Sequence, residues 1–184
     1  MTSGGDAAGM NPAIKAAVDH ARQLGMNPYV VYDGLEGLID GKIKEATREL
    51  TNDMIYRGGT LLRSSRSKRF FDYEFRKQAY EHLKERNIDK LIIMGGDGSF
   101  RALNDFFNDF EVPFAGIPAT IDNDIVCTDY TIGYDTAANT AVEAIDKLRD
   151  TTQSHDRCSV VEVMGHHAGY IALNVGIATG AVAV

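Results

Sequence analysis

The stretch Lys90–Phe100, KLIIMGGDGSF, decides the fold, because an apolar strand runs directly into a glycine-rich turn that contains one acid. The continuous apolar run over residues 90–94 predicts a strand buried on both faces, which is typical of parallel sheets. The glycines that follow permit a tight turn, and a helix is expected to start near Ser99. This strand, turn and helix predict an α/β protein.

The same alternation extends on both sides of this stretch. Helices are predicted over residues 10–25, 75–89 and 134–152, and further strands over residues 28–34, 112–117 and 159–164. Strands joined by crossover helices form a parallel sheet covered on both faces. The sequence therefore predicts an α/β/α sandwich, with ligands bound at the carboxyl ends of the strands.

Two of the predicted helices have a clear buried face. In the first, Asn11 is expected to cap the helix and Pro12 to occupy its first position. The residues expected to face inward are Ile14, Ala17, Val18, Ala21 and Leu24 in this helix, and Ala137, Ala141, Val142, Ile145 and Leu148 in the helix over residues 134–152.

Composition narrows the class of protein. A length of 184 residues suits one α/β domain, or one domain and the start of a second. The net charge of −7 disfavours nonspecific binding to nucleic acid or to an anionic membrane, although a basic cluster at Arg63, Arg66, Lys68 and Arg69 could bind a small anion. No apolar run is long enough for a membrane helix, which predicts a soluble protein. Only two cysteines occur, without metal-binding spacing, so we expect structural thiols and a cytoplasmic location.

Four glycine-containing loops fall at the expected strand ends: TSGGDAAGMN at residues 2–11, GGDGSF at 95–100, PATIDND at 118–124 and MGHHAG at 164–169. Glycines allow backbone N–H groups to approach a ligand closely, and the positive end of a following helix suits phosphate. A tight turn alone would also require glycine. Neither a GK[ST] loop nor a GxGxxG helix start occurs, which disfavours the common NTPase and dehydrogenase folds.

Acids accompany these loops. They are Asp6, Asp97, Asp122 and Asp124. An acid beside a polyphosphate requires a neutralising cation, so Asp97 is predicted to hold Mg²⁺, with a turn or capping role as the alternative. Asp122 could accept a proton from an attacking hydroxyl, and an Asx-turn is the structural alternative.

The segments TSGGDAAGMN, GGDGS, TIDNDI, TDYTIGYDTA and SVVEVMG resemble, in order and spacing, the bacterial ATP-dependent 6-phosphofructokinases. The resemblance covers essentially the whole chain. It implies the phosphofructokinase fold, with an ATP and Mg²⁺ domain over residues 1–133 and the beginning of a fructose 6-phosphate domain over residues 134–184. The chain resembles a fragment that lacks the family's first strand and much of the second domain, so the 184 residues alone are expected to be inactive.

The resemblance also implies roles for individual residues. It assigns ATP binding to Gly5, Arg66, Ser67, Gly96, Asp97, Gly98 and Ser99, with Mg²⁺ at Asp97. It assigns the sugar phosphate to Thr120, Asp122, Asp124, Arg157, Met164, Gly165 and His166. The catalytic set is Asp122 as general base, Arg66 on the transferred phosphate, and Thr120. It assigns effector binding to Lys15, Arg48 and Arg149. Because Arg157 matches an arginine that reaches a neighbouring subunit, the resemblance implies a homotetramer.

Individual positions bear on the phosphoryl donor, on sugar-phosphate binding and on regulation. Gly98 and Ala119 favour ATP, because pyrophosphate-dependent relatives usually have aspartate and lysine there. His166 replaces a common arginine, and Asp19 replaces a basic effector residue, so allosteric regulation could be weakened. The alternatives are a pyrophosphate-dependent phosphofructokinase and a nucleotide-binding polypeptide without turnover.

Overall fold

The strand β3, Leu91–Gly95, lies at the centre of the first part of the fold in a computed structural model that describes all 184 residues. It pairs in parallel with β4, Phe114–Pro118, in a register that places Leu91 opposite Phe114 and Gly95 opposite Pro118. The predicted parallel pairing is confirmed for these two strands. The chain divides into two units, Met1–Ala119 and Thr120–Val184, and each is described by itself.

The first three residues occupy the other edge of β3. The Met1 amino group donates to the Ile92 carbonyl at 2.9 Å, and Met94 N–H donates to the Met1 carbonyl at 3.0 Å. Ser3 N–H then donates to the Met94 carbonyl at 3.0 Å, and Thr2 forms a parallel bridge with Met94. The backbone of β3 therefore has partners on both edges.

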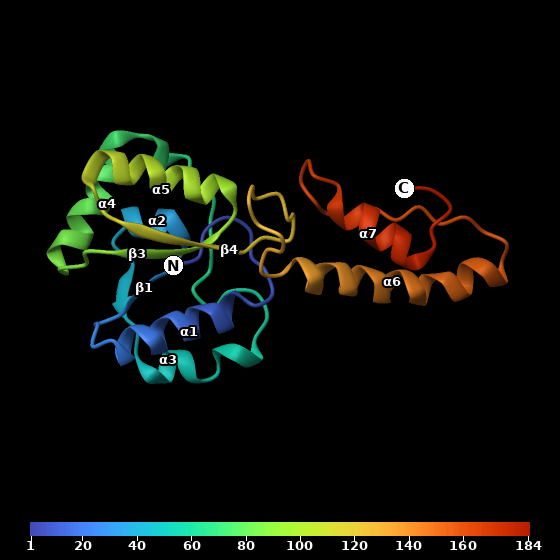
Figure 1. Ribbon diagram of the computed structural model, residues 1–184, viewed down its shortest axis with the longest axis horizontal. Coiled ribbons are helices and arrows are strands. Elements are labelled where there is room, and N and C mark those ends of the chain that lie inside the picture. The colour runs from blue at the N-terminus through green and yellow to red at the C-terminus, as the bar shows by residue number, and fades with distance from the viewer. The chain divides into compact units, whose positions relative to one another are not determined.

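Helices lie on both faces of this sheet, as the α/β/α prediction requires (Figure 1). α4, Tyr73–Glu85, and α5, Asp97–Phe110, cover one face, whereas α1, Met10–Gln23, and α3, Arg48–Asn52, lie on the other. Short 3-10 helices, Met54–Tyr56 (η1) and Arg69–Phe71 (η2), follow α3 and precede α4. The largest fully buried apolar side chains in the layer under α4 and α5 are Leu38, Ile39, Phe70, Leu83, Ile93, Leu103 and Phe106.

The strand predicted over residues 28–34 forms a different pairing from the one expected. β1, Tyr29–Val31, pairs antiparallel with β2, Ile43–Glu45, in a separate two-stranded sheet. The connection holds only the short helix α2, Gly34–Ile39, and a turn at Gly41 with φ of 68°. A connection this short reverses the chain, whereas a parallel crossover needs a dozen or more residues.

Three details predicted for α1 are wrong. The helix begins at Met10, so Pro12 is its third residue and not its first. Gly9, not Asn11, occupies the N-cap position. Asn11 is fully buried within the helix, where its amide accepts a hydrogen bond from Leu61 N–H at 2.7 Å and donates one to the Arg57 carbonyl at 2.9 Å. Its side chain therefore serves a tertiary contact. Leu24, expected to face inward, follows the last helical residue and is exposed.

The second unit consists of two packed helices, α6, Tyr134–Ser154, and α7, Tyr170–Thr179. The inward face predicted for α6 is confirmed at Ala137, Ala141, Val142 and Ile145, but Leu148 is exposed. The strand predicted over residues 159–164 is not formed, and Val160 is 96% exposed. Strand backbone needs a neighbouring strand for its hydrogen bonds, and this unit contains none.

No helix of the structure combines the length and the hydropathy needed to cross a membrane. Both cysteines, Cys127 and Cys158, are exposed free thiols, so the prediction that they are structural residues is not supported by burial.

We predict that Gly95→Ala destabilises the fold whereas Gly98→Ala does not. A Cβ at Gly95 would lie 2.6 Å from the Ser3 carbonyl oxygen, which belongs to the backbone and cannot move without breaking the pairing with β3. We expect a loss of about 1–3 kcal/mol in the free energy of unfolding. A Cβ at Gly98 meets no atom within 4 Å, which makes it the matched control. Equal urea midpoints for the two variants would contradict this prediction.

We further predict that a polypeptide starting at Met1 becomes more stable as the pH rises from 6 to 8. Burial lowers the pKa of the Met1 amino group from 8.0 to about 6, because the charged form loses its hydration. Between these values the unfolded chain binds a proton that the folded chain lacks, so the free energy of unfolding increases with pH, by at most about 2.7 kcal/mol. Urea unfolding at both pH values measures this increase. An Nα-acetylated chain has no titrating amine and should show a smaller increase, and an equal increase would contradict the prediction.

Candidate functional site

Three of the predicted phosphate-binding segments meet in the first unit. Gly4 N–H donates to the Ser65 carbonyl at 3.4 Å, and Ser64 Oγ donates to the Gly4 carbonyl at 2.8 Å. A Cβ at Gly4 would lie 3.4 Å from Ser99 Oγ. The loop with Gly5, the segment with Arg66 and Ser67, and the loop Gly96–Ser99 are therefore neighbours.

The start of α5 offers free backbone donors at this place. Gly96 is the N-cap residue, and no side chain caps the helix. Ser99 and Phe100 N–H both donate to the Gly96 carbonyl, whereas Asp97 and Gly98 N–H make no hydrogen bond within the chain. Unpaired N–H groups and the positive end of the helix dipole together favour an anion. Gly5 and Gly98 are both exposed and have open space where a Cβ would lie, so a ligand could approach this backbone.

Asp97 is exposed in the first turn of α5 and pairs with Arg101, whose Nε lies 2.7 Å from its Oδ2. No group of three or more His, Cys, Asp or Glu side chains gathers anywhere in the structure, so the protein alone forms no metal cage. Mg²⁺ commonly takes one or two carboxylates together with phosphate oxygens. The single carboxylate of Asp97 beside an anion-binding helix start fits that mode of binding.

Arginines in the basic cluster differ in their partners. Arg69 forms ion pairs with Glu36 and, at 3.0 Å, with Asp40. Hydrogen bonds from Arg69 and then from Ser67 hold the pKa of Glu36 below its usual value. The side chain of Arg66 is exposed and makes no hydrogen bond or ion pair. Arg69 thus fixes the segment, and Arg66 remains available to a ligand.

A surface hollow of about 580 Å³ lies along α5, next to the glycine loop. Its lining consists of Phe71, Phe100, Arg101, Asn104, Asp105 and Phe114. Arg101 belongs both to this lining and to the ion pair with Asp97. No sequence pattern indicated this hollow, because its aromatic residues come from three separate segments.

The predicted acceptor loop lies in the second unit and is held by hydrogen bonds. Thr120 Oγ1 donates to Asp122 Oδ2 at 3.2 Å and also accepts from Asp122 N–H at 3.2 Å. Asn123 Oδ1 accepts from Thr131 N–H at 2.9 Å, and Asn123 Nδ2 donates to the Asp129 carbonyl at 3.1 Å. The Asp122 carboxylate is half-buried and oriented by Thr120, with one oxygen left without a partner.

Of the other predicted sugar-phosphate residues, His166 approaches this loop. His166 Nδ1 lies 3.5 Å from Asp124 Oδ2. Gly165, directly before His166, has a φ of 155°, and the side chain of Met164 is exposed. The side chain of Arg157 is exposed and has no partner within the chain.

Two predicted effector residues are paired with acids. Lys15 Nζ donates to Asp19 Oδ2 at 2.8 Å, and Arg149 lies 3.5 Å from Asp146. Arg48 is exposed at the start of α3. Asp19, identified as a departure from the family pattern, therefore neutralises one of the cations on which effector binding was expected to depend.

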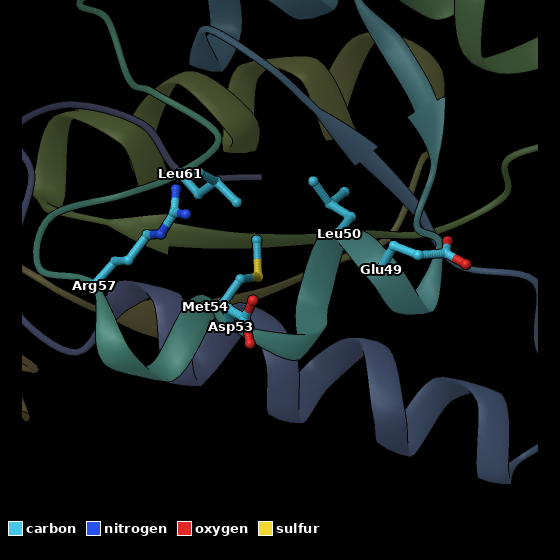
Figure 2. A pocket seen from close by; sticks show the side chains of 6 residues that line it. All are labelled: Glu49, Leu50, Asp53, Met54, Arg57 and Leu61. Atoms are coloured by element: carbon cyan, nitrogen blue, oxygen red, sulfur yellow. The ribbon is translucent and has the colours of Figure 1, made fainter.

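A second pocket, of about 220 Å³, lies beside α3 and η1. Figure 2 shows the side chains of Met54 and Leu50 directed toward it, with Arg57 and Leu61 at its other end. Glu49 and Asp53 complete the lining. No predicted site residue contributes to it, and no sequence motif indicated it, because packing of two short helices creates it.

The chain is similar over its whole length to proteins of one family. The sequence model of the family described as phosphofructokinase matches residues 1–184. The ATP-dependent 6-phosphofructokinases of Wolinella succinogenes and Thermoanaerobacter sp. are 53% and 48% identical to the chain over 181 residues, which is 98% of the chain. The chain spans only 57% and 56% of those relatives' own lengths.

Solved structures give the same result for the fold. The phosphofructokinase of Saccharomyces cerevisiae superposes with a TM-score of 0.90 at 37% identity, over 98% of this chain and 27% of that one. A pyrophosphate-dependent phosphofructokinase from Marinobacter aquaeolei superposes with a TM-score of 0.81 over 96% of this chain and 48% of that one. At 23% identity the second likeness shows the shared fold alone.

Proposed function

The chain belongs to the phosphofructokinase family, and we propose that it is part of an ATP-dependent 6-phosphofructokinase. The proposed reaction transfers the γ-phosphate of ATP to the 1-hydroxyl of fructose 6-phosphate and gives fructose 1,6-bisphosphate in glycolysis. The observation that carries the proposal is the meeting of three segments, with Gly5, Arg66 and Gly98, at the uncapped start of α5. The names of the relatives at 48–53% identity support the choice of substrates.

The donor side of the proposed reaction uses the first unit. Backbone N–H groups of Asp97 and Gly98 bind phosphate oxygens at the positive end of α5. Arg66, which has no partner within the chain, follows the transferred phosphate with its fixed charge and planar set of donors. The hollow lined by Phe71 and Phe100 offers room and aromatic surface for the nucleoside end of ATP.

Asp97 would hold Mg²⁺ together with the phosphate oxygens, after release of its ion pair with Arg101. When bound, the ion would neutralise part of the negative charge of the phosphate groups. Gly5, Gly96 and Ser99 complete the proposed donor site through the loops that surround the helix start.

The acceptor side uses the second unit. Asp122 accepts the proton of the sugar 1-hydroxyl as that oxygen attacks phosphorus, through the carboxylate oxygen that Thr120 leaves without a partner. Thr120 holds the other oxygen, so the carboxylate keeps one orientation. The rest of the sugar-phosphate site is proposed to comprise Asp124, Arg157, Met164, Gly165 and His166.

We further propose a cytoplasmic homo-oligomer, tetrameric as the family resemblance implies, with Arg157 contributing to a neighbouring subunit's site. Its exposed side chain without a partner in the chain supports that role. Effector binding at Lys15, Arg48 and Arg149 is proposed to be weak, because Asp19 and Asp146 already neutralise two of these cations.

We predict that Asp122→Asn, in the whole protein that carries this chain, lowers kcat by at least about a hundredfold, because the amide cannot accept the proton. The KM for fructose 6-phosphate should change by less than about threefold, since the amide keeps the shape of the carboxylate. Asp129→Asn in the same loop is the matched control and should keep normal turnover. A normal kcat for Asp122→Asn would exclude Asp122 as the base.

We also predict that Gly98→Asp lowers kcat/KM for ATP at least about tenfold, because a second carboxylate beside Asp97 repels phosphate. Gly98→Ala adds a methyl group in open space and should stay within about threefold of the original enzyme. Assays of both variants with ATP and with pyrophosphate distinguish the proposed phosphoryl donor, ATP, from the alternative donor, pyrophosphate. Faster turnover of the unaltered protein with pyrophosphate than with ATP would favour the pyrophosphate-dependent alternative.

A further inference from the structure

The contact between Asp124 and His166 joins two loops that are far apart in the sequence. His166 Nδ1 lies 3.5 Å from Asp124 Oδ2, and the side chains are 57% and 28% exposed. It is the only ion pair between the segment Thr120–Thr131 and the segment Met164–Gly169. Apart from this contact, the Asp124 carboxylate has no hydrogen-bond partner in the structure.

The backbone on both sides of this contact is held in an uncommon conformation. Asn123 and His166 have φ of 53° and 52°, in the left-handed region. The side-chain amide of Asn123 forms hydrogen bonds with Asp129 and Thr131, so Asp124 directly follows a residue that is held in place. The geometry gives two acids of this loop, Asp122 and Asp124, different partners: Thr120 for the first and His166 for the second.

We propose that His166 is a positioning residue that neutralises and restrains Asp124, so that this carboxylate does not repel the phosphorylated sugar. The proposal rests on the proposed function, because it concerns the same acceptor loop. His166 acts through Asp124 and does not take part in the proton transfer at Asp122. Its loss should therefore raise the KM for fructose 6-phosphate and leave kcat nearly unchanged.

The pairing makes sugar-phosphate binding depend on the charge at position 166. A cation beside Asp124 offsets the negative charge of this carboxylate, whereas an uncharged side chain there leaves Asp124 as an uncompensated anion near the incoming phosphate. The groups that face His166 are the Asp124 carboxylate and the ring of His167, whose centroid lies 4.3 Å away.

Four variants of the whole protein test this proposal. His166→Asn removes the cation, and asparagine tolerates the left-handed backbone, so the loop conformation is retained. His166→Arg places a permanent positive charge at the same position. Asp124→Asn removes the carboxylate on which His166 acts. His167→Asn is the control, since His167 has no ion pair with an acid.

The KM for fructose 6-phosphate should be at least about threefold higher in His166→Asn than in His166→Arg. His167→Asn should keep the KM of the original protein. In the Asp124→Asn background, His166→Asn should have no further effect.

Calorimetric binding of fructose 6-phosphate provides the same comparison without turnover. An active protein in which His166→Asn and His166→Arg have the same KM for fructose 6-phosphate would overturn the role of His166 and leave the proposed function intact. A further loss in the Asp124→Asn background would also overturn it. A protein that neither binds nor phosphorylates fructose 6-phosphate would overturn both proposals.

Discussion

The hydrogen bonding of β3 along both of its edges is the constraint on which the first unit depends. Met1–Ser3 pair with one edge and β4 with the other, and the Ser3 carbonyl lies so close to Gly95 that no side chain could be accommodated there. This close approach places the first glycine loop against the start of α5. The hydrogen bonds between Gly4 and the segment Ser64–Ser65 then bring the segment with the basic cluster to the same place. A change in the strand pairing would separate all three segments.

The cation that fixes the segment before α4 and the cation that has no partner within the chain are different residues. Arg69 is engaged by Glu36 and Asp40, which fixes the segment before α4, whereas Arg66 has no partner. Exposed ion pairs contribute little to stability, so a ligand can replace them at small cost. The pair of Asp97 with Arg101 is of this kind, because both side chains are largely exposed. The pair of Lys15 with Asp19 is more enclosed and occupies one of the cations for which effector binding was predicted.

In the second unit, hydrogen bonding distinguishes two carboxylates that the sequence places only two residues apart. Asn123 fixes the loop between them through contacts with Asp129 and Thr131. Asp122 is then oriented by the Thr120 hydroxyl, and Asp124 faces His166. Different partners make different roles possible, one carboxylate as a proton acceptor and the other as a neutralised part of the site.

The sequence by itself determined the order and type of the longer elements and the glycine loops, because periodicity and turn residues are local properties of the chain. The resemblance of its motifs indicated the family. It could not determine which segments pair. β1 and β2 form an antiparallel pair, and residues 159–164 have no neighbouring strand with which to pair. Asn11 forms hydrogen bonds with Arg57 and Leu61 and does not cap α1. The contact of Asp124 with His166 and the aromatic hollow beside α5 were decided in the same way, because both join distant segments whose distances only tertiary packing sets.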